Sequence, residues 1–274
     1  MDSFGLDWLE KVRRGFDHGG ERMLKILAIA QVTFLEILRE KVLYNVLLCG
    51  ACLLSVGVFA SHLSFIQPQR VVFHFGLSGL SLSCCALGVL LGASLLGREW
   101  ERKTAHLVFC RPLSRVHFIL GKYFGLVGIL SLHWILLALT LMGILNLVFH
   151  GPWISGIFFQ ALCLLYLESL ILAGFALFFS TFTTSALSVI FSVGFYALGN
   201  THSQLRFLEQ GGTQWLWKVL RVVLPHFEYF HLGTRVFYQL PMPSFWVLGS
   251  VLYAFLMVGC SLSLASAVIL SREL

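Results

Sequence analysis

Two titratable side chains stand inside long apolar stretches, where they could hold a proton or contact a bound molecule. Glu168 is a formal charge near the centre of one apolar run, and His133 lies at the matching depth of the preceding run. A charge at that depth of a membrane costs about 2.5–3.5 kcal/mol, so Glu168 is expected to be neutral, paired or facing water. We expect Glu168 and His133 to form a hydrogen-bonded pair. The pair is either a proton-sensitive or substrate-contacting site or a structural clasp, and the modest strength of intramembrane hydrogen bonds favours the clasp.

A possible serine nucleophile occurs in Gly76-Leu77-Ser78-Gly79, which matches the GxSG pattern of intramembrane rhomboid-type proteases. A serine nucleophile needs a histidine base within reach. Those proteases carry HxxxN on an earlier helix, and this sequence has no such motif. The same run is rich in small residues, including Gly88-x-x-x-Gly92, which allow membrane helices to approach closely. Helix packing is therefore favoured, and an intramembrane serine hydrolase built on Ser78 is the weaker alternative.

No metal-binding or nucleotide-binding pattern is found. The histidines expected on the outer side lack HxH or HxxxH spacing, and no CxxC pair lies on a polar loop. These histidines are His62, His74, His150, His202, His226 and His231. The nearest approach to a phosphate-binding loop is Gly121-Lys122, but Tyr123 replaces the required Ser or Thr and Val116 replaces the first Gly. We expect no metal or cofactor in this chain and no nucleic-acid partner.

The composition predicts the solvent around these residues. Of the 274 residues, 58% are hydrophobic and 12% are charged, whereas a soluble domain has roughly 25% charged residues. Lipid is therefore the expected solvent, and only helices and closed barrels satisfy their backbone groups there. A barrel would alternate apolar and polar residues. The apolar runs here are continuous, so the sequence predicts an all-α membrane protein.

Charges and helix breakers divide the chain into a cytoplasmic region, residues 1–41, and a six-span domain, residues 42–274. The expected spans are residues 42–60, 73–96, 119–149, 154–179, 185–198 and 245–270. The fifth is short for the ~20 residues that a bilayer requires. The long outer loop, residues 200–244, contains an amphipathic stretch that ends at Pro225. We expect this loop to re-enter the membrane in part and to complete the fifth span.

The basic residues predict the orientation. With the N-terminus inside, the inner segments hold 14 of the 19 Lys and Arg residues, so both termini are expected in the cytoplasm. Phe4, Trp8, Val12 and Phe16 recur every four positions, which suits a helix lying in the cytoplasmic interface. A second helix over residues 23–41 is expected to lead into the first span as an elbow.

The inner segment between the second and third spans, residues 98–115, has the most informative pattern. We call it the coupling segment. It opens densely charged and continues with aliphatic residues, and the short helix expected within it ends at Arg111-Pro112. Its candidate functional residues are Arg98, Glu99, Glu101, Arg102, Lys103, Thr104, Leu107, Arg111 and Arg115. A short amphipathic helix held between two spans could transmit force from a soluble partner. The alternative is a solvated basic loop of the kind common on the cytoplasmic side.

This pattern resembles the signature of ABC exporter permeases of the second type, a group that includes permeases for copper-enzyme maturation. The matching pieces occur in order: Glu99 or Glu101, Thr104, Leu107-Val108, Pro112-Leu113-Ser114-Arg115 and Gly121-Lys122. Lys103 stands where the family usually has Gly. Residues 28–41, 179–182, 224–225 and 271–274 also resemble the family's elbow helix, turn after the fourth span, outer loop and terminus.

The resemblance implies a permease subunit without ATPase activity in a bacterial-type inner membrane. A separate ABC ATPase, carrying ATP and Mg, would dock on the coupling segment, and a second permease copy or homologue would complete the transporter. Transport by alternating access would follow, with an unidentified substrate. A non-transporting membrane anchor that holds a soluble complex is the alternative from another class.

Overall fold

The computed structural model describes residues 23, 26–63, 68–101, 115–149, 156–201, 225–231, 238 and 244–271, and every regular element among them is helical. Five α-helices are long and apolar enough to cross a membrane. The chain is therefore a multi-pass helical membrane protein, as its composition predicts. In the described ranges these helices are α2 (Lys41–Leu63), α3 (Pro68–Glu101), α5 (Arg115–Phe149), α6 (Gly156–Ser180) and α10 (Ser244–Ser271).

The fifth expected span is α7 (Ser185–Asn200), which has 16 residues. At 1.5 Å per residue it is about 24 Å long, shorter than the ~30 Å hydrocarbon core. Six full spans are thus not established, whereas the predicted segments all contain helices close to the expected bounds. A 3-10 turn, η2 (Phe227–Phe230), packs against both α6 and α7. The outer loop, in its described part, therefore returns to the bundle beside the short helix.

The centre of the bundle is the contact between α3 and α6. Buried residues make up 78% of the apolar window of α3 and 67% of that of α6, against 22% in both α2 and α10. A Cβ atom on Gly92 would lie 2.9 Å from the Ala173 carbonyl oxygen, so only glycine allows this approach of the two backbones. The predicted packing role of Gly88 and Gly92 is confirmed, since both face α6.

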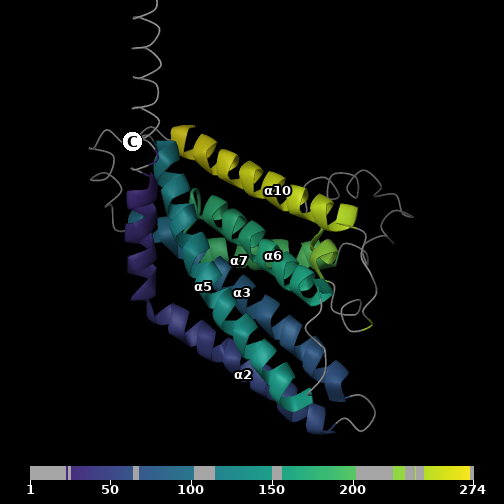
Figure 1. Cartoon of the computed structure of the whole chain (residues 1–274). Helices are drawn as coiled ribbons and strands as arrows, with labels where there is room; N and C mark the ends of the chain where they lie inside the picture. Colours follow the sequence, from purple (N-terminus) through teal and green to yellow (C-terminus); the bar gives the residue numbers. More distant parts are fainter. Residues whose placement is uncertain are drawn as a thin grey trace, which may run out of the picture.

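The peripheral helices α2 and α10 lie on opposite sides of this α3–α6 contact (Figure 1). Each exposes large apolar side chains along its length, including Phe59 on α2 and Phe255 on α10. A soluble protein rarely leaves so large an apolar area in water. These faces suit the lipid that the composition predicts.

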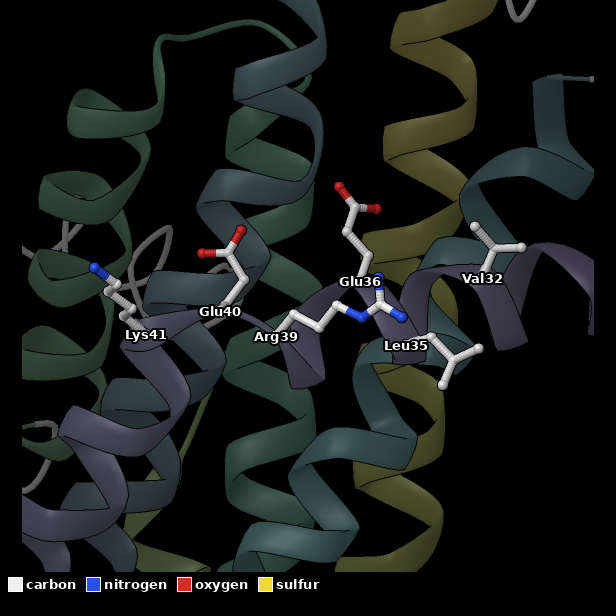
Figure 2. Close-up of a pocket in the computed structure, with 6 residues that line it drawn as sticks. All are labelled: Val32, Leu35, Glu36, Arg39, Glu40 and Lys41. Carbon is white, nitrogen blue, oxygen red and sulfur yellow. The ribbon is translucent and has the colours of Figure 1, made fainter.

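A short apolar helix, Ile26–Leu38, precedes α2. It buries Thr33 and Ile37 and rests on glycines of α5, where a Cβ on Gly125 would lie 2.8 Å from the Ala30 carbonyl oxygen. The helix ends in a turn in which the Glu40 amide donates to the Ile37 carbonyl at 2.9 Å. Figure 2 shows it running across the neighbouring helices and labels the side chains that line a hollow at its junction with α2. The predicted interfacial helix near residues 4–16 lies outside the described residues.

Candidate functional site

The most polar part of the helix bundle is organised by two serines of α3. Ser81 and Ser83 are two positions apart, which places them about 200° from each other around a helix. Ser81 faces Glu168 of α6, and Ser83 faces His133 of α5. Both serines belong to the run of small residues for which the sequence predicts helix packing. Their hydroxyls in fact supply hydrogen bonds to the two titratable side chains.

Glu168 is completely buried. Its Oε2 accepts a hydrogen bond of 3.2 Å from the Ser81 hydroxyl, while its Oε1 has no hydrogen-bond partner. Nδ1 of His231 lies 3.8 Å from Oε1. That distance is longer than a hydrogen bond but within the range of an ion pair. One carboxylate oxygen is thus held by α3, and the other faces a residue that is distant in the sequence.

His231 ends the segment that brings it there, residues 225–231, which we call the plug segment. Phe227 and Phe230 of η2 are fully buried, and the Phe227 ring lies 5.5 Å from that of Tyr196 on α7. The His226 amide donates to the hydroxyl of Tyr253 on α10 at 3.1 Å. The plug segment is therefore inserted among α6, α7 and α10. The i, i+3 spacing of its two phenylalanines was the available sequence signal.

The imidazole of His231 has one inward and one outward side. Nδ1 lies 3.2 Å from the Phe227 carbonyl oxygen. A carbonyl oxygen can only accept, so Nδ1 carries a hydrogen and donates it. The side chain as a whole is 41% exposed. The partly exposed His231 thus lies within ion-pair distance of the completely buried carboxyl of Glu168.

His133 occupies a separate, enclosed position. It is fully buried, its Nε2 lies 2.8 Å from the Ser83 hydroxyl, and its Nδ1 has no hydrogen-bond partner. The predicted hydrogen bond between His133 and Glu168 is therefore wrong. The next residue, Trp134, faces α6 because its indole donates to the Leu162 carbonyl at 3.1 Å. One position earlier on a helix lies about 100° away, which turns His133 toward α3.

The contact between α5 and α6 is made by other side chains, which sequence reasoning missed. The Ser131 and Tyr166 hydroxyls lie 2.6 Å apart, and the Tyr123 hydroxyl donates to the Leu170 carbonyl at 3.1 Å. With the Trp134 indole, these groups form a row along the two helices. They form the clasp that had been assigned to Glu168 and His133.

The other chemical candidates are not assembled into sites among the described residues. Ser78 is exposed on α3, and no hydrogen bond from it to a histidine is found there. In the same part of the chain, no three His, Cys, Asp or Glu side chains are grouped as metal ligands would be. His62, His74, His226 and His231 occupy described positions, and His150 and His202 lie outside them.

The coupling segment joins two unusually long helices. α3 ends at Glu101 after 34 residues, and α5 begins at Arg115 and has 35 residues. At 1.5 Å per residue each is about 50 Å long, well above the ~30 Å of a hydrocarbon core. Arg102, Lys103, Thr104, Leu107 and Arg111 lie outside the described residues, as do the side chains of Arg98, Glu99, Glu101 and Arg115. The predicted roles of these residues stay predictions.

No protein-family model matches the chain, and no curated protein matches it either.

Proposed function

We propose that this chain is the permease subunit of an ABC transporter, driven by a separate ATPase that docks on the coupling segment. The observation that carries the proposal is the pair of long helices, α3 and α5, that bracket this segment. Both exceed the thickness of a hydrocarbon core by several turns. A force applied to the coupling segment would therefore be transmitted to α3 and α5, two long helices of the bundle.

The helix Ile26–Leu38 supports the same arrangement. It packs on α5 at Gly121 and Gly125, close to the start of α5, where the coupling segment ends. Its hollow is lined by both apolar and charged side chains, Val32 and Leu35 beside Glu36 and Arg39. Such a mixed surface suits the boundary between membrane and water. The helix would act as the elbow that links the first span to the membrane surface.

The sequence supports separate roles for the permease and the ATPase. The chain carries no phosphate-binding loop, so ATP and Mg belong to the partner ATPase. A second permease copy or homologue would pack beside this one and form the translocation path, which would open alternately to each side of a bacterial-type inner membrane. Both termini and the coupling segment would lie in the cytoplasm, because this orientation would put most Lys and Arg residues on that side.

Mutations in the coupling segment test this function when the chain is produced together with a candidate ABC ATPase from the same genome. Leu107→Asp should reduce the amount of ATPase that co-purifies by about tenfold or more, because an unpaired carboxylate buried at an interface costs several kcal/mol. Glu101→Lys should weaken docking less, since rim charges contribute less than buried groups. ATPase stimulation by the permease should fall in the same order.

A matched control uses the opposite end of the same helix. Arg70 is exposed near the start of α3, so Arg70→Glu changes a charge as strongly without touching the coupling segment. It should leave co-purification and ATPase stimulation unchanged. If Leu107→Asp and Glu101→Lys both retain the full amount of ATPase and its stimulation, the coupling segment is not the docking site. A membrane anchor without transport would then be the better interpretation.

A further inference from the structure

We propose that Glu168 and His231 together bind one titrating proton, and that this proton holds the plug segment in the helix bundle. The inference goes beyond transport and does not depend on it. It stands on three observations: a fully buried carboxylate oxygen without a hydrogen-bond partner, a histidine nitrogen 3.8 Å from it, and the 41% exposure of that histidine. The ligand of this site is a proton, delivered through the exposed imidazole.

The net charge of the pair decides how well the plug segment fits. With one titrating proton the pair is neutral, either as imidazolium and carboxylate or as imidazole and carboxylic acid. Without it, a carboxylate anion remains in the bundle, and with a second proton an imidazolium cation lies beside a neutral acid. An unbalanced charge in a low-dielectric interior is costly, and opening the plug segment to water relieves that cost. The closed arrangement is therefore most stable at an intermediate pH.

Among the described residues, few other titratable groups face the pair. The groups that face it from neighbouring elements are Ser81, Cys84 and Cys85 of α3, Tyr196 of α7 and Tyr253 of α10. Serine, tyrosine and cysteine side chains are ordinarily uncharged near pH 7. On the plug segment itself, His226 and Glu228 are titratable. Both are therefore addressed in the experiment.

The test measures how much of the plug segment is docked as a function of pH. Spin labels are attached at Glu228→Cys and at Leu63→Cys, two exposed positions, after the seven native cysteines are replaced by alanine. The label at position 228 also removes that carboxylate from the titration. Pulsed electron paramagnetic resonance then gives the populations of docked and undocked distances in detergent or nanodiscs. This readout does not need transport, so it can fail while the proposed function stands.

In the doubly labelled protein without further mutations, the docked population should pass through a maximum between about pH 5 and 8. This is the range in which histidine residues usually change charge. The docked-to-undocked ratio should fall about fivefold on each side, as expected for a partly exposed ion pair. The maximum should disappear in His231→Gln and in Glu168→Gln, because a single titrating group has no opposite charge to balance it. His226→Gln, a histidine of the same segment, should keep the maximum.

A docked population that does not change with pH in the doubly labelled protein would overturn the proposal. So would a maximum that survives in His231→Gln. If Glu168→Gln fails to fold, His231→Gln still decides the question, because its side chain is partly exposed and its replacement leaves the bundle core intact.

Discussion

Glu168 and His133 are two titratable side chains with the same burial and different surroundings. Each is fully buried, and each is hydrogen-bonded to a serine of α3. Glu168, however, faces the exposed His231 of the plug segment, while the hydrogen-bond partner found for His133 among the described residues is Ser83 of α3. Undocking of the plug segment would therefore expose the Glu168 carboxyl to water. Exposing the imidazole of His133 would require α3 and α5 to separate. Burial alone does not show whether a polar group is structural or accessible.

The comparison also separates two ways of holding a helix bundle together. The position of His133 is fixed by long helices and their glycine contacts, which depend on close backbone approach. That of Glu168 depends in addition on two phenylalanines of the plug segment. Mutations can therefore affect one position without the other.

The largest effect is expected from Phe227→Ala. The ring is fully buried, and its loss should cost about 3 kcal/mol of docking free energy, so that most molecules carry an undocked plug segment. The spin-label distance between positions 228 and 63 measures this directly. Phe255→Ala on α10 is the control, since that ring is 66% exposed, and it should leave the docked population unchanged. Equal losses in both variants would show that the plug segment is not held by its buried ring.

His133→Ala should lower the free energy of unfolding by about 2 kcal/mol, because it leaves a cavity and removes the shorter of the two hydrogen bonds of Ser83. It should not change docking of the plug segment. Glu168→Gln should cost less, under about 1 kcal/mol, since glutamine keeps an oxygen that accepts from Ser81. Denaturant unfolding in detergent, followed by circular dichroism, gives both values. A larger loss in Glu168→Gln than in His133→Ala would reverse the assignment of accessible and structural positions.

The smallest effect concerns the two serines. Ser81→Ala and Ser83→Ala should each cost about 0.6 kcal/mol, the average for hydrogen bonds inside membrane proteins. Double-mutant cycles should give coupling between Ser81 and Glu168 and between Ser83 and His133. The crossed combination of Ser83 with Glu168 should be additive. Coupling in that crossed cycle would mean that both titratable groups share one network, as their equal depth had suggested.

The sequence by itself determined where the helices are. Continuous apolar runs bounded by charges predict spans because a bilayer requires a nearly fixed length of apolar helix, and the observed helices begin and end close to those bounds. The same reasoning identified Glu168 and His133 as unusual and the glycines of α3 as a packing surface. These features depend on composition and position along the chain, which are fully present in one sequence.

The tertiary structure decided which side of each helix faces which neighbour. Glu168 and His133 have matching depth, yet neighbouring positions on a helix point about 100° apart, and Trp134, not His133, faces α6. Hydropathy carries little information about this rotation, because both lipid and the bundle interior accept apolar side chains. The meeting of His231 with Glu168 was equally hidden. It depends on a plug segment whose position is set by contacts with three helices, and such contacts exist only once the helices have packed.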